Sequence, residues 1–398
     1  MKHFFITAVA LAVSLSASAQ HYYQDESNPD IYRHSVVKRS NRSELVVPGI
    51  RGYNVYKADL HIHTIYSDAE FTPDMRVREA WRDGLDIIAI TDHVEYRRIE
   101  GKMMNFLKGY MPDGTKAINT NIIRGERDKN YGIFADLNYS VKEAKSVGKK
   151  YGITVISGAE ITREPVAYGH YNALFTTDNN SIYDDDPAQS MRNAIAQGAI
   201  IMHNHPGWSR KSADYTEFEK KVYAEGLISG VETNNGSEFY PKIIDRALQQ
   251  KLFVSSNTDI HASTYDEYAL QGQMRNMTLV FAKDCTEKSI KEALLDCRTL
   301  ALSFGTLSGD KDMLKDFFNA SVSYKVIYVS SKGAPTVLIT NNTSIPYIIR
   351  MPGANPIVLE PFSSIRTGVG KDKSLKFTVD NMWCGENERL EIEWKDLK

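Results

Sequence analysis

The sequence predicts an α/β barrel followed by a small all-β sandwich. Between residues 53 and 317, short β-branched segments alternate with amphipathic helical segments, and repeated alternation of this kind favours a parallel barrel. Residues 318–398 instead contain period-two segments separated by Gly, Pro and Asn turns, which is typical of a β-sandwich. Polar residues end each expected barrel strand, where the chemistry of such barrels gathers.

The first residues predict a secretory signal peptide, residues 1–19. Lys2 gives a basic start, an apolar run follows, and Ala17 and Ala19 place small residues before the expected cleavage point. The apolar run is shorter than the roughly 20 residues that a membrane span needs. We therefore expect an exported protein without a membrane span, in a bacterial periplasm, with residues 20–52 forming an N-terminal arm.

The net charge and the cysteines limit which partners and which cross-links the sequence predicts. A formal net charge of −2 provides no general positive field, so no specific nucleic-acid platform is expected and the partner is a small molecule. The three cysteines, Cys285, Cys297 and Cys384, form neither a disulfide framework nor a zinc-ribbon pattern, so we expect buried free thiols. The sequence does not specify an oligomeric state.

Start signals and polar endings define the elements of the barrel. Thr72 with Pro73, and Asp186 with Pro187, are typical of a helix N-cap followed by the first helical residue. A further helix is expected over "TEKSIKEALLD". Residues 97–134 have no clear period and are expected to form a loop over the barrel mouth. The expected strands that follow the first one are "DGLDIIAITDH", "GITVISGAE", "GAIIMHNHP", "GLISGVETNN" and "KLFVSSNTD".

The C-terminal segments alternate apolar and polar residues and show no helix signal. Their composition includes no cluster of histidines, so we expect a structural or binding role and a barrel that keeps its site without them. The expected strands are "ASVSYKVIYVS", "PTVLITNNTS", "YIIRMPG", "KSLKFTVDN" and "RLEIEWKD".

Histidines and carboxylates gather at the ends of the barrel strands. One such histidine is more often a structural residue than a ligand, but all seven histidines between residues 61 and 261 lie at strand ends. Imidazoles and carboxylates crowded together are costly to bury unless they share cations. Without thiolates they suit Zn²⁺, Mn²⁺ or Fe²⁺, and their number calls for two or three ions. The candidate ligands are His61, His63, Asp68, His93, Glu160, His170, His205, Asp259 and His261.

In this order, "DLHIHTIYSD", "ITDH", "SGAE", "GHYNAL", "HNHPG" and "SNTDIH" resemble the motif set of the PHP (polymerase and histidinol phosphatase) superfamily. The resemblance covers about residues 55–300. It implies a distorted (β/α)7 barrel and a metal-dependent phosphoesterase. A barrel with a signal peptide and a small β domain looks most like exported bacterial phosphodiesterases that act on small organophosphate diesters.

The resemblance also implies a ligand assignment. One ion would be held by His61, His63, Glu160 and Asp259. Glu160 would bridge to a second ion held also by His170 and His205, and a third would be held by Asp68, His93 and His261.

The family's usual "AHP" is "HNHP" here, which leaves two candidate histidines on one strand. His205 is assigned to the metal because it directly precedes Pro206. His203 is expected on the same strand face, because residues two apart in a strand point the same way. Three roles remain open for it: supporting a ligand, donating a proton to the leaving group, or packing in the core.

The mechanism that follows is in-line attack on phosphorus by a metal-activated hydroxide, on a phosphodiester or a phosphomonoester. Arg163 and His203 are the candidate catalytic residues. Arg163 lies three residues after Glu160, and its guanidinium could hold a phosphate in a bidentate manner. Trp208 would pack against the organic group of a substrate or in the core.

Two alternatives come from other classes. An amidohydrolase also begins its barrel with His-x-His, but it often uses a carboxylated lysine where this chain has Glu160. A non-catalytic exported binding protein would show degenerate ligands, and none is missing. The complete ligand set therefore favours the phosphoesterase.

Overall fold

A computed structural model describes residues 29–30, 42–95, 136–162 and 165–397 of the chain. The elements below all lie in one compact unit, Arg42–Lys398. The expected signal peptide, most of the N-terminal arm, the insertion at 97–134 and Arg163 lie outside the described residues. Every helix within the described part of the chain is too short or too polar to span a membrane.

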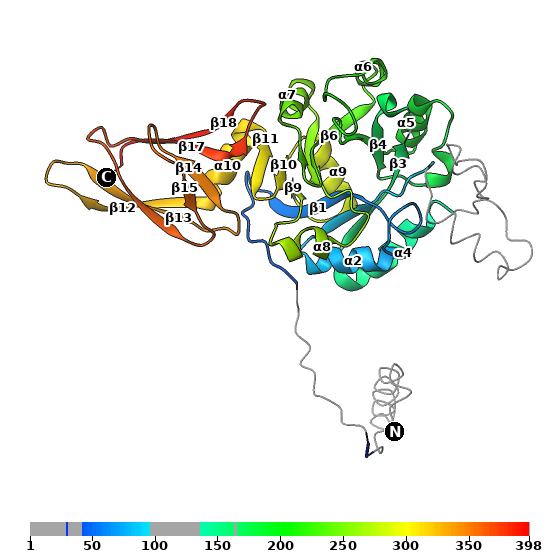
Figure 1. Cartoon of the computed structure of the whole chain (residues 1–398), viewed down its shortest axis with the longest axis horizontal. Helices are drawn as coiled ribbons and strands as arrows, with labels where there is room; N and C mark the ends of the chain where they lie inside the picture. Colours follow the sequence, from blue (N-terminus) through cyan, green and yellow to red (C-terminus); the bar gives the residue numbers. More distant parts are fainter. Residues whose placement is uncertain (1–28, 31–41, 96–135, 163–164, 398) are drawn as a thin grey trace, which may run out of the picture. The chain divides into compact units, whose positions relative to one another are not determined.

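One long mixed sheet carries the predicted site (Figure 1). Of the seven principal strands named below, the first three in chain order are parallel to one another, the fourth is antiparallel to the strand on either side of it, and the last three are again parallel. These strands are β1 (Asn54–Ile62), β2 (Ile87–Ile90), β3 (Thr154–Thr162), β4 (His170–Leu174), β5 (Ile200–Asn204), β6 (Ile228–Asn235) and β8 (Phe253–Asn257), with the short β7 (Glu238–Phe239) beside β6.

The expectation of an all-parallel arrangement is wrong at β4. Only a short connection containing the 3₁₀ turn η2 (Val166–Tyr168) joins β3 to β4. A connection between parallel strands needs a dozen or more residues. The connection between β3 and β4 is shorter than that, so the two strands run antiparallel. A single bridge, Ile62 with Ile260, joins the ends of the β1 and β8 segments. The structure thus establishes a mixed α/β sheet, and the closed seven-unit barrel stays a prediction.

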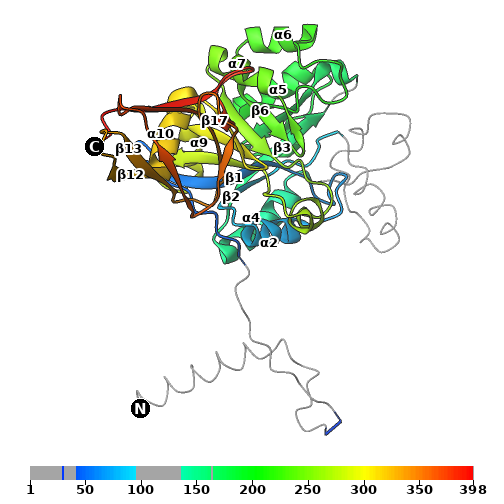
Figure 2. The same ribbon diagram turned by 60° about the vertical axis from the view of Figure 1, so that its left-hand side comes forward.

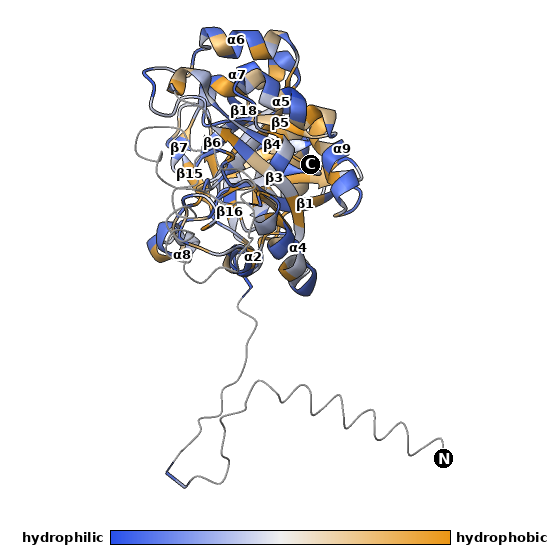
Figure 3. Ribbon diagram, turned by 90° about the vertical axis from the view of Figure 1, so that its right-hand side faces the viewer, coloured by the Kyte–Doolittle hydropathy of each residue, from blue (hydrophilic) through white to orange (hydrophobic). Residues whose placement is uncertain are grey.

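The two helix starts predicted from the sequence, and the helix expected over residues 286–296, are confirmed. Thr72 accepts a hydrogen bond from the backbone N–H of Met75, and Asp186 accepts one from Ala188. Thr286 caps the third helix in the same way. The helices carry both hydrophilic and hydrophobic residues, as amphipathic elements around a sheet do (Figure 3). They are α2 (Pro73–Arg82), α4 (Tyr139–Tyr151), α5 (Pro187–Ala196), α6 (Glu217–Ala224), α7 (Pro241–Gln250), α8 (Thr264–Glu267) and α9 (Glu287–Leu295).

The C-terminal strands form two layers, one of which continues the long sheet. β17 is parallel to β11, and β11 is linked through β10 and β9 to β1. The other layer has the strand order β12-β13-β16. The elements are β9 (Met277–Ala282), β10 (Thr299–Ser303), β11 (Thr306–Gly309), α10 (Lys311–Ser321), β12 (Val322–Val329), β13 (Pro335–Asn341), β14 (Tyr347–Arg350), β15 (Ile357–Leu359), β16 (Ser364–Gly368), β17 (Leu375–Trp383) and β18 (Arg389–Trp394).

The five expected C-terminal strands are present, and β15 and β16 were not predicted. Figures 1 and 2 show β12 and β13 on the side of α10 and away from α5 and α6. One hydrophobic core joins this part to the rest, because Leu302 of β10 lies in the same cluster as Phe318 and Phe377. The predicted boundary between residues 317 and 318 falls inside α10, and independence of the two parts stays a prediction. The three cysteines are free thiols. Cys384 is buried as expected, whereas Cys285 and Cys297 are only half-buried, so the expectation of burial is wrong for these two.

Candidate metal centre

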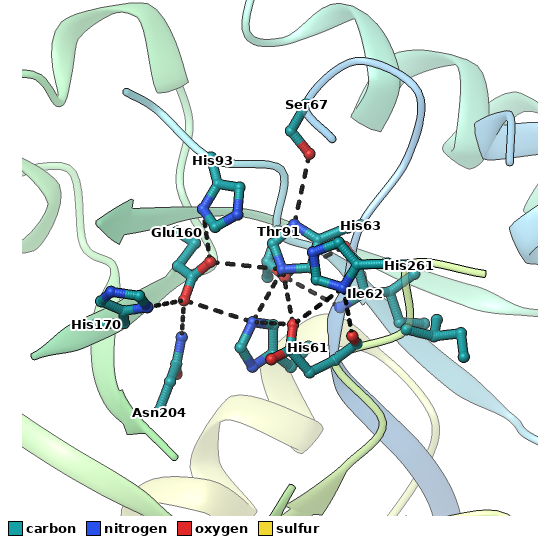
Figure 4. A network of polar contacts seen from close by, with 12 residues as sticks. His61, Ile62, His63, Ser67, Thr91, His93, Glu160, His170, Asn204 and His261 are labelled. Atoms are coloured by element: carbon teal, nitrogen blue, oxygen red, sulfur yellow. Dashed lines mark hydrogen bonds and ion pairs between the residues drawn. The ribbon is translucent and has the colours of Figure 1, made fainter. Parts of the chain in front are cut away.

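The nine predicted ligand side chains lie together. Figure 4 labels His61, His63, His93, Glu160, His170 and His261 among them. β4 supplies its ligand, His170, from its first residue, because this strand is antiparallel to both of its neighbours. The other ligands come from strand ends and the loops that follow them. His61 lies on β1, with His63 and Asp68 just after it; His93 follows β2, Glu160 lies on β3, His170 begins β4, His205 follows β5, and Asp259 and His261 follow β8.

Glu160 lies at the centre of the cluster and is 1% exposed. Its two carboxylate oxygens approach five imidazoles that come from four different strand ends. Oε1 lies 3.6 Å from Nε2 of His61, 3.5 Å from Nδ1 of His170 and 3.7 Å from Nε2 of His205, and Oε2 lies 2.7 Å from Nδ1 of His93 and 3.4 Å from Nε2 of His63.

Two further carboxylates flank Glu160. Oδ1 of Asp259 lies 3.1 Å from Nε2 of His61 and 3.0 Å from Nε2 of His63. Asp68 lies 3.2 Å from Nε2 of His261 and also approaches His93 and His63. Asp259 has a φ of +52°, a left-handed conformation that is uncommon among residues other than glycine, although aspartate adopts it more often than most, and that is often found at functional sites.

The ligand atoms form three overlapping groups that could each hold a metal ion. The three ligands that the family resemblance implies for the third ion, Asp68, His93 and His261, lie in one group, which also includes His63. The ligands implied for the first ion are divided between the other two groups. His170 belongs to none of the three groups, although it lies close to Glu160. The groups are His63, Asp68, His93 and His261; His61, His63 and Asp259; and His61, Glu160 and His205.

The donor set fits divalent cations. One buried oxygen on each of Asp68, Glu160 and Asp259 receives no hydrogen bond of good geometry, although imidazole nitrogens lie close by. Nε2 of His61 lies 3.1 Å from Nε2 of His63, so two nitrogen ligand atoms face each other. Imidazole nitrogens and carboxylate oxygens that converge in this way are the ligands that Zn²⁺, Mn²⁺ and Fe²⁺ accept.

The ionisation of these groups also suits metal binding. Burial, together with the nearby His261 and His93, lowers the pKa of His63 to about 4. Burial alone would raise the pKa of Glu160, but the surrounding imidazoles, His93 and His61 foremost, hold it well below its usual value. The centre therefore contains ionised carboxylates beside one neutral imidazole, which are the forms that bind metal. Burial lowers the pKa of His61 and His93, but the adjacent carboxylates outweigh it and raise both pKa values well above the usual value, so a metal ion bound there would displace protons.

Several residues that the sequence reasoning missed orient the ligands. Glu232 on β6 is fully buried, lies 2.9 Å from Nδ1 of His61 and accepts a hydrogen bond from the backbone N–H of His205. Asn204 donates to Oε1 of Glu160. Such partners fix the direction of a ligand and its tautomer. The sequence signal for Glu232 was a carboxylate near the polar end of an otherwise apolar strand segment.

The structure does not bring His203 to the metal centre. The expectation that His203 and His205 share a face is wrong, because β5 ends at Asn204 and His205 has a φ of +24°, which turns its side chain back toward Glu160. His203 is fully buried, with Nδ1 2.8 Å from the hydroxyl of Tyr223 and Nε2 3.2 Å from Glu219. Burial lowers its pKa. Of the three roles left open, this environment supports packing in the core.

Trp208 stands beside the centre. Its ring centroid lies 5.4 Å from those of both His170 and His205, and the residue is 43% exposed. It is therefore not a core residue, and its ring borders the ligands on one side.

Comparison with known proteins agrees with this arrangement. The PHP domain model matches residues 59–299. No curated protein matches the chain. Among solved structures, a two-domain protein from Bacteroides vulgatus that contains a predicted PHP-like metal-dependent phosphoesterase is 29% identical, with a TM-score of 0.77 over 90% of this chain and 100% of that one.

Weaker structural matches were also found. A lesion-specific endonuclease from Pyrococcus furiosus is 14% identical with a TM-score of 0.38, covering 65% of this chain and 59% of that one. An amidohydrolase from Chromobacterium violaceum is 14% identical with a TM-score of 0.35, covering 52% and 89%. Likenesses at these TM-scores establish nothing about function. The PHP domain model, however, spans more than half of the sequence, and the chain therefore belongs to the PHP domain family.

Proposed function

We propose that the protein is a metal-dependent phosphoesterase that hydrolyses small phosphate esters, with phosphodiesters preferred. The observation that carries the proposal is the convergence of nine candidate ligand side chains with the buried Glu160 at their centre, more than one ion can use. The PHP domain match and the phosphoesterase relative from Bacteroides vulgatus support it. The proposal includes two or three Zn, Mn or Fe ions and export, as the N-terminal sequence predicts.

The three ligand groups described above would hold the ions. Bound divalent ions would neutralise charge on the phosphoryl oxygens, lower the pKa of an attacking water and stabilise the leaving group. The chain itself keeps the ligands in place: Thr64 and Ser67 donate hydrogen bonds to Asp92, which secures the loop that carries Asp68. Trp208, whose ring lies beside that of His170, would contact the organic group of an ester.

Metal content is the first expected result. The purified protein should hold two to three equivalents of transition metal and lose its hydrolytic activity to a chelator, since the ligands exceed the needs of one ion. Elemental analysis before and after chelation measures this, with activity restored by adding back metal as the control. A fully active enzyme with one equivalent or fewer would contradict the multinuclear centre.

The substrate class is tested by parallel assays on bis-p-nitrophenyl phosphate, p-nitrophenyl phosphate and a p-nitroanilide amide. We expect the diester to be hydrolysed fastest and the amide not at all, because the centre is proposed to act on phosphorus. Faster hydrolysis of the monoester would reverse the proposed preference. Hydrolysis of the amide alone would support the amidohydrolase alternative, and a metal-loaded protein inactive on all three would support a binding protein.

A further inference from the structure

Arg76 of α2 is a buried charge that no step proposed above uses. It is 1% exposed, although a guanidinium is costly to remove from water unless all of its donors are paired. Its helix has other contacts that hold it in place, since Val77 and Ala80 pack in a hydrophobic cluster. Docking of the helix therefore does not by itself explain a buried arginine.

The donors of Arg76 bind the backbone of the two chain segments that carry metal ligands. Nε donates to the carbonyl of His63 at 2.8 Å. Nη2 donates to the carbonyls of Ile260 at 3.1 Å and His261 at 3.0 Å. Nη1 donates to the carbonyl of Ala262 at 2.7 Å and to Oε2 of Glu79 at 2.8 Å. One side chain thus links the segment after β1 to the segment after β8.

We propose that Arg76 is a positioning residue that sets the distance between these two segments and thereby the affinity of one metal ion. The inference rests on the metal centre of the proposed function. His63 and His261 belong to the same ligand group, and their rings stack with centroids 4.4 Å apart. The ion whose affinity depends on Arg76 is the one held by that group, His63, Asp68, His93 and His261.

The planar guanidinium of an arginine is suited to linking two chain segments. A guanidinium offers five N–H donors in fixed directions, so it reaches carbonyls on two segments at once. A lysine offers three donors from a single nitrogen at the end of a flexible chain. Arg76→Lys keeps the positive charge beside Glu79 but cannot reproduce the link between the segments.

Arg42 provides a matched control. Its guanidinium also donates to two backbone carbonyls, those of Trp81 and Leu85, each at 3.0 Å, and to the carboxylate of Asp86. None of these residues is a candidate ligand or follows one directly. Arg42→Lys therefore removes the same kind of contact away from the metal centre.

The experiment compares the wild type, Arg76→Lys and Arg42→Lys by chelator competition and by the visible spectrum after loading with Co²⁺. In Arg76→Lys we expect one metal equivalent to bind about 10- to 100-fold more weakly, as when a partner of a ligand is lost, and its Co²⁺ absorption to change. The remaining metal and the Arg42→Lys variant should keep wild-type affinity. Wild-type affinity for every equivalent in Arg76→Lys, or equal weakening in Arg42→Lys, would overturn the inference.

A second variant keeps the test decisive if Arg76→Lys does not fold. Glu79→Gln removes the negative charge beside the guanidinium, while its amide oxygen can still accept the hydrogen bonds that Thr264 donates to Oε1. It should weaken the same metal equivalent by a smaller factor; unchanged affinity would overturn the inference. No readout involves a substrate. A wild-type protein that binds metal but hydrolyses no phosphate ester would therefore refute the proposed function and leave this inference standing.

Discussion

The Glu160→Gln variant is expected to lose at least one metal equivalent and to hydrolyse phosphate esters slower by a factor on the order of 10³ or more. The carboxylate of Glu160 lies near five candidate imidazole ligands, more than any other carboxylate of the centre. An amide in its place removes the negative charge that attracts cations to this position. Metal catalysis contributes several kcal/mol, and about 1.4 kcal/mol corresponds to a tenfold change in rate. Elemental analysis and the rate on the best ester measure the two effects.

Glu219 of α6 supplies the matched control. It is as deeply buried as Glu160 and also faces an imidazole, that of His203. Its other side-chain partners are Arg210 and the backbone N–H of Thr216, and neither residue is a candidate ligand. Glu219→Gln should keep its metal and lose stability instead. Loss of metal from both variants would show that any buried carboxylate change disturbs the centre, and full activity in Glu160→Gln would refute the central role of Glu160.

The second large effect separates two histidines of the same segment. His205→Ala should lose a metal equivalent and nearly all activity, because Nε2 of His205 lies 3.7 Å from both Glu160 and Asp259. His203→Ala should keep its metal, because its ring stacks on Tyr171 and faces Glu219, away from the ligands. Its expected loss is stability, about 1–3 kcal/mol for the buried groups left without a partner.

Metal stoichiometry and urea unfolding of both variants decide the matter. The two changes remove the same side chain from positions two residues apart, so each variant is the control for the other. Metal loss in His203→Ala with full retention in His205→Ala would place the ligand two residues earlier. An unaltered stability of His203→Ala would contradict the core role that its contacts indicate.

The convergence of the ligands could be predicted because it depends on which strand ends carry them. His61 and Asp259 each lie at the end of an apolar segment, and ends of parallel strands meet at one edge whatever the exact pairing. His170 was also predicted, although it begins a strand. The sequence patterns do not state the direction of β4, but a reversed strand places its first residue where its neighbours place their last.

Other features depend on contacts that alternation and spacing do not encode. The orientation of His205 follows from a backbone φ of +24°, so strand parity misplaced it relative to His203. Glu232 was missed because its role appears only when β6 lies beside the ligands. The parallel pairing of β17 with β11 joins residues such as Leu307 and Met382, far apart in the sequence, and local patterns suggested two separate domains there instead.

The antiparallel pairing of β1 with β9 bears on the order in which the chain folds. Tyr56 pairs with Val280, so this edge of the first strand stays unpaired during synthesis until most of the chain has been made, whereas its other edge can pair with β2 much earlier. His61 and His63 likewise cannot contact Asp259 and His261 until those later residues have been synthesised. Contacts this distant in sequence form late and slowly, and metal stabilises only a chain that has assembled its ligands. Metal uptake should therefore mark the completion of folding in this protein rather than nucleate it.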